Sequence, residues 1–387
     1  MILLIRRINL TLIGAMRKLP LITSFAVAAC ALVASYSQAC TGGGLVAKDG
    51  SVVTGRTLEF GVPLDSALLV YPAGSSFQGD TPKGPNTGVK FTSKYGFCGL
   101  DAFGHKDAIV EGVNEAGLSA GIFYFKGVAK FMENDPSKYD QGMSPIQVIT
   151  YILSSFETVE EVEKGLNDIS ILPVVLEALK GVPPVHYRVT DASGKCIAIE
   201  PINGEIKVFD NPLLSFTNNP EFPWMLTNLQ NYVTLSPDYP KPLNLNGYEI
   251  SPTGLGSGLA GLPGDFSPPS RFVRIALFTH FAPEQANAGA ATATLFHILN
   301  NFDIPPGSAM EPEGQSGYDF TTWTAVTDLE NRLFYWKTFG HQNISMIDLK
   351  QALKVAGDNM LTLALPDQNT TSIGSAMDMT GELQAAQ

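Results

Sequence analysis

The sequence predicts an α+β fold in which antiparallel sheet predominates. Short β-prone segments follow one another closely and are separated by turn residues, which favours antiparallel pairing of neighbours. Helical patterns are fewer and occur in separate blocks along the 387 residues. Strands and helices in separate blocks are typical of layered α+β domains, and the chain shows no internal repeat that would indicate a solenoid.

The clearest strand pair is a hairpin around Lys48-Asp49-Gly50. Asp-Gly between two β-prone runs is a strong hairpin signal. A three-residue loop would set Leu58 opposite Cys40 and place Arg56 on the same face as Cys40. A two-residue loop would present Glu59 there instead, because a slip of one residue exchanges the two faces of a strand.

A second hairpin is expected over residues 110–125, and helices are expected where capping residues precede apolar periodicity. The capping signals are Ser144-Pro145, which opens a helix to Phe156, and Thr158-Val159-Glu160-Glu161, which opens another. Two more helices are predicted near residues 268–281 and 286–299. The other β-prone segments are residues 40–47, 51–60, 186–190, 196–201, 206–209, 213–217, 321–328 and 333–338.

The first 39 residues differ from the rest in composition. They hold four basic residues and no acidic one, and an apolar stretch over residues 19–33 is followed by small residues, Ser37 and Ala39, shortly before Cys40. This pattern is typical of a signal peptide, so we expect export to the periplasm or the medium. Met16-Arg17-Lys18 would open a complete signal peptide by itself, so the true start is either Met1 or Met16.

The remaining chain is expected to form one domain of residues 40–366, followed by a disordered polar tail of residues 367–387. Without residues 1–39, 21 basic and 37 acidic residues give a formal charge of −16. Such an acidic surface repels phosphate backbones, which argues against nucleic acids as partners. The histidines lack metal-ligand spacing, and the GxGxxG pattern at residues 256–261 follows no convincing strand, so neither a metal nor a cofactor is expected.

Three cysteines follow the leader, namely Cys40, Cys98 and Cys196. An odd number in an oxidising compartment indicates that at least one has a purpose beyond a disulfide, and pairing of Cys98 with Cys196 stays open. Cleavage after Ala39 would give Cys40 a free α-amine, whose ordinary pKa of roughly 7.7–8.0 suits a general base. A nearby guanidinium, for which Arg56 is the candidate, would favour the thiolate.

Two other interpretations of Cys40 stay open, a purely structural cysteine and a lipid-modified one. Ser37 is a poor lipobox residue for Cys40, whereas Val27-Ala28-Ala29 before Cys30 fits a lipobox better. A lipid at Cys30 would leave Cys40 internal until a second cut. The chain would then be an exported lipid-anchored or binding protein whose Cys40 is not catalytic, and mass spectrometry of the mature N-terminus would separate this alternative from an enzyme.

Six segments between Cys40 and about Leu349 together resemble the choloylglycine hydrolase family, which contains conjugated bile acid hydrolases and penicillin V acylases. The segments are Ala39-Cys40-Thr41, Gly55-Arg56-Thr57-Leu58-Glu59, Gly112-Val113-Asn114-Glu115-Ala116-Gly117-Leu118, Thr217-Asn218-Asn219-Pro220, Gly261-Leu262-Pro263-Gly264-Asp265 and Ser270-Arg271-Phe272-Val273-Arg274. The resemblance implies an N-terminal nucleophile amidohydrolase that acts on non-peptide linear amides. It also implies a four-layer αββα sandwich of two antiparallel sheets between helix layers, and a homotetramer.

The resemblance assigns roles to five residues. It implies Cys40 as nucleophile, Arg56 beside its sulfur and Glu59 hydrogen-bonded to the α-amine. The better-known members carry Asp where this chain has Glu59, so the side chain is one methylene longer here. Asn218 matches the asparagine of the oxyanion hole, and Arg271 matches a second active-site arginine at the start of a predicted helix, where the helix dipole disfavours a cation.

The resemblance also places a main-chain oxyanion donor in residues 120–125, at Phe123 or Tyr124. Bile acid hydrolases have Asn there and penicillin V acylases have Tyr, so the aromatic residues favour the acylase side. Penicillin V, a bile acid conjugate, an acyl-homoserine lactone and a fatty N-acyl amide stay open as substrates. Apolar side chains that could line an acyl pocket, or simply fill the core, are Phe60, Leu64, Phe123, Phe125, Phe131 and Met143.

Overall fold

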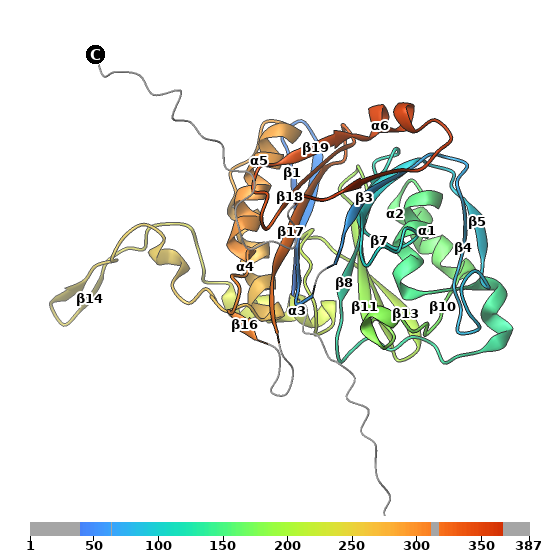
Figure 1. Ribbon diagram of the computed structural model, residues 1–387. Helices are drawn as coiled ribbons and strands as arrows, with labels where there is room; N and C mark the ends of the chain where they lie inside the picture. The colour runs from blue at the N-terminus through green and yellow to red at the C-terminus, as the bar shows by residue number, and fades with distance from the viewer. Residues whose placement is uncertain (1–38, 63, 311–316, 367–387) are drawn as a thin grey trace, which may run out of the picture. The chain divides into compact units, whose positions relative to one another are not determined.

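The computed structural model describes residues 39–62, 64–310 and 317–366. The predicted leader before Ala39, including Cys30, and the predicted tail of residues 367–387 lie outside the described residues. Two large antiparallel sheets, each with helices on its outer face, form the described part (Figure 1). The α+β prediction and the four-layer order are confirmed.

The first sheet carries Cys40 on its edge strand. Its strands, in spatial order, are β1 (Cys40–Val46), β2 (Val52–Phe60), β17 (Tyr318–Asp328), β18 (Leu333–Thr338) and β19 (Ser345–Asp348), with β16 (Ala309–Met310) paired to β17. All of these pairs are antiparallel. Every residue of β2 is buried, because one face of this sheet covers the second sheet and the other face is covered by helices.

The second sheet has eight strands and faces the first. In spatial order they are β13 (Glu205–Asp210), β12 (Cys196–Ile202), β11 (Val185–Thr190), β8 (Ser119–Tyr124), β7 (Ile109–Asn114), β6 (Phe97–Asp101), β3 (Ala67–Tyr71) and β20 (Leu361–Ala364). The predicted hairpin of residues 110–125 is the pair β7–β8, with Gly117 in the left-handed conformation that its turn requires.

Helices complete the outer layers. Helices α4 (Pro268–Phe281) and α5 (Ala288–Leu299) contact β1 and β2, while α1 (Val148–Ser155) contacts β7 and β8 and is followed by α2 (Val159–Gly165). In Figure 1, α4 and α5 lie beside β1 and β17, and α1 and α2 lie beyond β7. The smaller elements are α3 (Phe222–Asn228), α6 (Leu349–Ala356), β4 (Ser76–Gln78), β5 (Lys90–Thr92), β9 (Gly142–Met143), β10 (Ser170–Ile171), β14 (Leu243–Leu245) and β15 (Tyr248–Ile250).

Three apolar clusters hold the layers together. The largest lies between the two sheets and includes Cys40 and Trp323. The second packs α1, through residues such as Ile152, against the outer face of the second sheet, and the third packs α5, through Leu295, against the first sheet. Burial of apolar area contributes roughly 25 cal/mol per Å², so these clusters supply the main driving force for layer formation. The nucleophile candidate therefore lies in the central core.

Two details differ from the sequence-based expectations. Residues 213–217 form no regular strand, and Phe216 makes only an isolated bridge to Gly42 of β1. The Thr158 hydroxyl accepts a hydrogen bond from the Glu161 amide at 3.3 Å as predicted, but the Glu161 carboxylate accepts from the Glu157 amide, so the capping box is incomplete.

Candidate active site

The β1–β2 hairpin has the register predicted for a three-residue loop. Cys40 lies opposite Leu58, and the Ala47 amide donates to the Ser51 carbonyl at 2.8 Å across the loop. Gly50 adopts a φ of 87°, which favours glycine. Arg56 therefore lies two residues from the partner of Cys40, on the same face of the sheet.

Asn218 is brought to Cys40 by the bridge at the edge of the first sheet. The Gly42 amide donates to Phe216 at 2.7 Å and the Phe216 amide donates back at 2.9 Å. This antiparallel register sets Asn218 opposite Cys40. The Cys40 main-chain N–H donates to Asn218 Oδ1 at 2.9 Å, and Asn218 Nδ2 donates to the Tyr124 carbonyl at 2.8 Å. One of the two Nδ2 hydrogens thus has an acceptor, and the second is available for a ligand.

Arg56 is fully buried beside the Cys40 side chain. Its Nε donates to the Thr57 carbonyl at 3.2 Å, its Nη1 donates to the Ile122 carbonyl, and its guanidinium carbon lies 4.1 Å from the centre of the Phe123 ring. Among the described residues, no hydrogen-bond partner lies within reach of Nη2. Arg56, which carries this donor, and Cys40 both line the same cavity.

The pKa of the Cys40 thiol reflects opposing effects. Burial, the largest, raises it, and so does the Glu59 carboxylate. The guanidiniums of Arg56 and Arg271 lower it, as does a main-chain hydrogen bond from Tyr124. The main-chain group beside the sulfur thus belongs to Tyr124, whereas Phe123 supports Arg56 with its ring.

Arg271 lies in the first turn of α4, and hydrogen bonds explain how a cation is tolerated there. Its Nη1 donates to the Cys40 carbonyl and, at 2.8 Å, to Thr41 Oγ1, while its Nη2 donates to Asn218 Oδ1 at 2.6 Å. Burial lowers the pKa of Arg271 to about 10, and the nearby Glu59 carboxylate opposes that shift. Arg271 thus links the nucleophile candidate to Asn218.

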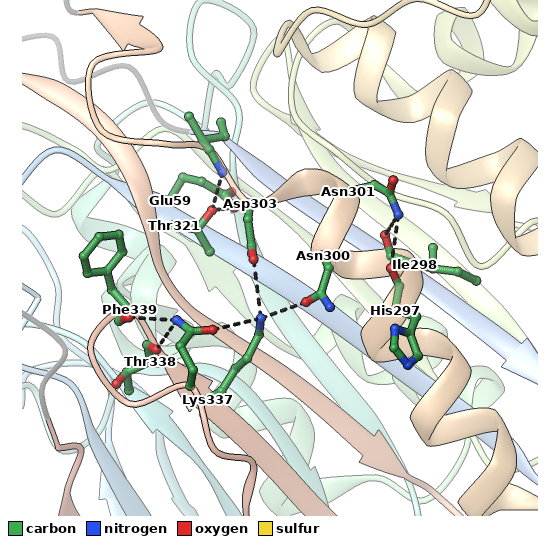
Figure 2. A network of polar contacts seen from close by, with 12 residues as sticks. Glu59, His297, Ile298, Asn300, Asn301, Asp303, Thr321, Lys337, Thr338 and Phe339 are labelled. Atoms are coloured by element: carbon green, nitrogen blue, oxygen red, sulfur yellow. Dashed lines mark hydrogen bonds and ion pairs between the residues drawn. The ribbon is translucent and has the colours of Figure 1, made fainter. Parts of the chain in front are cut away.

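Glu59 is buried on the opposite face of β2 and belongs to a polar network (Figure 2). Thr321 Oγ1 donates to Glu59 Oε1 at 2.9 Å and accepts from the Ile304 amide at 2.8 Å. Beyond it, Lys337 Nζ donates to Asn300 Oδ1 at 2.8 Å. The Glu59 amide also donates to the Ala39 carbonyl at 3.0 Å, so Glu59 is adjacent to the peptide bond that leader removal would break.

Burial raises the pKa of the Glu59 carboxyl from 4.5 to about 7, against the opposing effects of the Arg271 charge and of the hydrogen bond from Thr321. The folded chain binds this proton more tightly than the unfolded chain. The corresponding stability is therefore fully present below pH 4.5 and is lost as the pH rises through about 7. A shift of this size corresponds to about 3 kcal/mol.

We therefore expect Glu59→Gln to remove this pH dependence in the chain that retains residues 1–39. Between pH 4.5 and pH 8 the free energy of unfolding of the variant, relative to the parent, should rise by about 3 kcal/mol. Urea unfolding at a series of pH values measures it. Glu249→Gln, at an exposed position on β15, is the matched control. A difference between variant and parent that stays constant with pH would contradict the expectation.

A mainly apolar cavity begins at Cys40 and Arg56 and lies between the two sheets. Its other lining residues are Leu58, Phe60, Leu64, Ala102, Phe103, His105, Ala108, Val110, Ile122, Tyr124, Ile146, Leu176, Leu179, Pro183 and Val185. Of the pocket candidates proposed from the sequence, Phe60 and Leu64 line it. The other four, Phe123, Phe125, Phe131 and Met143, are buried but do not line this cavity.

A second, more polar cavity lies on the main-chain side of the Cys40 position. Ala39, the last residue of the predicted leader, lines it together with Arg271 and Asn219. Its other lining residues are Lys126, Asp265, Phe266, Ser267, Pro268, Ser308, Ala309 and Asp319. Cys40 thus lies between an apolar cavity on its side-chain side and a polar cavity at its N-terminal neighbour.

The three cysteines in the described residues are buried and free. Cys98 on β6 and Cys196 on β12 are separated in the sheet by β7, β8 and β11, which is several times the reach of a disulfide. The described part holds no group of three or more side chains suited to a metal ion. It also holds no helix of the length and apolarity needed to cross a membrane.

Sequence reasoning missed two charged residues of this region, Glu111 and Arg188. Glu111 Oε2 lies 3.9 Å from Arg56 Nη1, and Glu111 Oε1 lies 3.5 Å from Arg188 Nη2, all of them buried. The available signal was an isolated charge within each of two otherwise apolar β-prone segments, because such a charge is rarely buried without a partner.

Comparison with known proteins places the whole described domain in one group. Residues 40–361 match the family model described as linear amide C–N hydrolases, choloylglycine hydrolase family. An uncharacterised protein of Paramecium bursaria Chlorella virus 1 is 32% identical over 80% of this chain and 100% of its own length. The bile salt hydrolase/transferase of Clostridium perfringens is 29% identical over 81% of this chain and 93% of its own length.

Solved structures give the same result for the fold. A variant of the conjugated bile acid hydrolase from Clostridium perfringens has a TM-score of 0.76 and 26% identity, covering 88% of this chain and 100% of that one. Penicillin V acylase from Agrobacterium tumefaciens has a TM-score of 0.68 at 24% identity, covering 86% and 94%, a likeness that concerns the fold alone. The four layers described above are thus those of an N-terminal nucleophile hydrolase.

Proposed function

Because the chain belongs to the choloylglycine hydrolase family of linear amide C–N hydrolases, we propose that it cleaves N-acyl amides through Cys40 once residues 1–39 have been removed. Removal of these residues would convert the Cys40 amide nitrogen, which now donates a hydrogen bond to Asn218 Oδ1, into an α-amine in the same place. The observation that supports this proposal best is the convergence of Arg56, Asn218 and the Tyr124 main chain on Cys40.

In the first half-reaction the α-amine takes the proton of the Cys40 thiol, and the thiolate attacks the carbonyl carbon of the amide. The carbonyl oxygen becomes an oxyanion, which the Tyr124 main-chain N–H and Asn218 Nδ2 hold by hydrogen bonds. The α-ammonium then protonates the leaving nitrogen, the C–N bond breaks, and an amine departs. A thioester between Cys40 and the acyl group remains.

In the second half-reaction the α-amine removes a proton from water, which attacks the thioester carbon. The same two donors hold the second oxyanion, the C–S bond breaks, and the carboxylic acid leaves. Arg56 favours the thiolate leaving group by its charge. Arg271 keeps the Cys40 carbonyl and Asn218 in place, and Glu59 lies where its carboxylate could bind the α-ammonium. The cycle needs no redox or metal chemistry.

The cavity favours a substrate with an apolar acyl group. Most of the lining side chains are aliphatic or aromatic, and Cys40 and Arg56 are among the few polar ones. An acyl chain or ring would bury apolar surface there, while a polar amine would face the second cavity, which Lys126 and Arg271 line. An apolar acyl group joined to a more polar amine is common to all four candidate substrates, namely penicillin V, bile acid conjugates, acyl-homoserine lactones and fatty N-acyl amides.

A side-by-side turnover assay on these four substrates, combined with mass spectrometry of the mature N-terminus, tests the proposal. We expect a free Cys40 at the N-terminus and hydrolysis of at least one substrate, with loss of activity on alkylation of Cys40. A lipid on Cys30 with Cys40 still internal, together with no turnover, would instead support the exported binding protein.

The cavity also predicts how acyl specificity can be changed. Val110→Phe adds a ring to the lining and should reduce kcat/KM for the bulkiest accepted acyl group relative to an acetyl amide, by roughly 10–100-fold. Val46→Phe, at an exposed position of β1, is the control and should leave the ratio unchanged. Kinetics normalised to active sites measure the ratio. If Val110→Phe lowered kcat/KM equally for bulky and small acyl groups, the acyl group would not bind in this cavity.

We also propose export to the periplasm or the medium, and assembly into a homotetramer. A segment around β14 and β15 supports assembly, because it carries an unusual number of exposed apolar side chains. They are Val233, Tyr239, Leu243, Leu245, Tyr248, Ile250 and Leu255. Isolated exposed apolar residues are ordinary, but a contiguous group of this kind is typical of a contact surface. Light scattering of the purified enzyme reports the oligomeric state directly.

A further inference from the structure

The charged residues Arg56, Glu111 and Arg188 form a buried cluster between the two sheets. Glu111 on β7 and Arg188 on β11 belong to the second sheet, whereas Arg56 belongs to the first. Glu111 makes ion pairs with both arginines, at 3.5 Å to Arg188 and 3.9 Å to Arg56. Buried charges are costly unless each has partners, so an arrangement of three in one core requires an explanation.

Arg188 connects this cluster to the hairpin that carries the nucleophile. Its Nη1 donates to the Gly43 carbonyl at 3.4 Å and to the Gly55 carbonyl at 3.3 Å. These carbonyls belong to β1 and β2, on either side of the hairpin. Arg188 thus holds both strands at the level of Arg56, which lies next to Gly55.

Glycines provide the room for these side chains. A Cβ atom at Gly121 of β8 would collide with the Glu111 carboxylate, and a Cβ atom at Gly42 of β1 would collide with the Arg188 guanidinium. Glycine within a strand normally weakens it, and it is often found where another group approaches closely. The backbone of both sheets is therefore built around this cluster.

The cluster carries one positive charge in excess when Glu111 is ionised, since two guanidiniums face one carboxylate. The other ionisable groups close to Cys40 are Arg271 and Glu59, whose charges offset each other once the pH exceeds the Glu59 pKa of about 7. Cys196, near Arg188, is a neutral thiol at neutral pH, because burial raises its pKa to about 11. The buried His186–Glu200 pair also lies near Arg56, but the Glu200 carboxylate already pairs with the His186 ring and accepts from the Phe222 amide. The group left to balance the excess is the thiolate of Cys40.

We propose that Glu111 and Arg188 are positioning residues for the amidase reaction, which hold Arg56 beside Cys40 and leave between the sheets one positive charge that the Cys40 thiolate balances. The proposal rests on Cys40 being the nucleophile, as argued above. Burial raises the pKa of Glu111, and the guanidiniums of Arg188 and Arg56 oppose that shift.

The two members of the pair should then have opposite effects on thiolate formation. Glu111→Gln leaves two uncompensated guanidiniums, which favours the thiolate, so the midpoint of thiolate formation should move to lower pH. Arg188→Gln leaves one guanidinium facing one carboxylate, so the midpoint should move to higher pH. Each shift should be roughly one pH unit, and the double variant, with the parental excess of one charge, should return to the parental midpoint.

The test is the rate of iodoacetamide alkylation of Cys40 against pH in the processed enzyme, with the labelled peptide identified by mass spectrometry. Arg188→Lys keeps the charge and should keep the parental midpoint. Lys195→Gln breaks an exposed ion pair with Glu160 and is the matched control. If a single Gln variant does not fold, the test uses Arg188→Lys and the double variant, both of which should keep the parental midpoint of thiolate formation. A shifted midpoint in both of them would overturn the proposal.

Shifts in the same direction for both single variants, or no shift in Glu111→Gln, would also overturn this inference. Failure of the proposed function would look different. In that case alkylation of Cys40 would leave turnover intact, whatever the midpoints of the variants. If alkylation of Cys40 abolishes turnover and the midpoints do not move in opposite directions, only the role of Glu111 and Arg188 is refuted.

Discussion

Cys40→Ser is expected to lower turnover by at least roughly a thousandfold, which is about 4 kcal/mol of transition-state stabilisation. A serine hydroxyl is far less acidic than a thiol, so the charge of Arg56 could not yield an ionised nucleophile at neutral pH. The substitution changes one atom in a site where Cys40 is 3% exposed, so the fold should be retained. Steady-state kinetics, corrected for the folded fraction, measure the loss.

Cys98→Ser and Cys196→Ser are the matched controls, because both residues are buried and free like Cys40. Each introduces a hydroxyl into the core, which costs about 1–3 kcal/mol of stability unless it finds a hydrogen bond. Thr190 Oγ1 donates to Cys196 Sγ at 3.2 Å, so the serine at that position keeps a partner. Turnover per folded molecule should stay near the parental value in both. Equal losses in all three variants, or an active Cys40→Ser enzyme, would refute Cys40 as the nucleophile.

Asn218→Ala is expected to lower kcat by roughly 100- to 1,000-fold, or about 2.7–4 kcal/mol, the usual cost of removing one oxyanion donor. The physical reason is that Nδ2 lies beside Cys40 and has a hydrogen to spare after its bond to the Tyr124 carbonyl. KM should change much less than kcat, because the interaction forms only with the oxyanion. Asn331→Ala, in the turn after β17, is the control.

Asn218→Asp separates this role from a purely structural one. The carboxylate keeps an acceptor for Arg271 and for the Cys40 nitrogen, whose bonds to Asn218 Oδ1 measure 2.6 Å and 2.9 Å. It has no N–H to offer an oxyanion. We therefore expect Asn218→Asp to be at least as impaired in kcat as Asn218→Ala. Near-normal kcat in Asn218→Asp would mean that Asn218 acts only by holding Cys40 and Arg271.

The sequence by itself determined the features that depend on neighbours along the chain. The Lys48-Asp49-Gly50 turn predicted the hairpin of β1 and β2 and limited its register to two possibilities, and the structure has the register of the three-residue loop. That register placed Arg56 on the Cys40 face. The main helices and most long strands were predicted for the same reason, since capping residues and apolar periodicity act over a few residues.

Only the tertiary structure decided which distant residues meet at Cys40. Asn218 is 178 residues from Cys40 along the chain. A single β-bridge between Phe216 and Gly42 brings it there, whereas the local sequence had predicted a regular strand over residues 213–217. Glu111 and Arg188 reach Arg56 from the opposite sheet, and residues from several loops line the cavity. Such contacts depend on how the two sheets stack and on which side chains are thereby buried away from water. No short-range sequence pattern contains that information. Sequence and the family resemblance therefore indicated Cys40 and the charged residues Arg56, Glu59 and Arg271, whereas stacking of the sheets added Glu111 and Arg188.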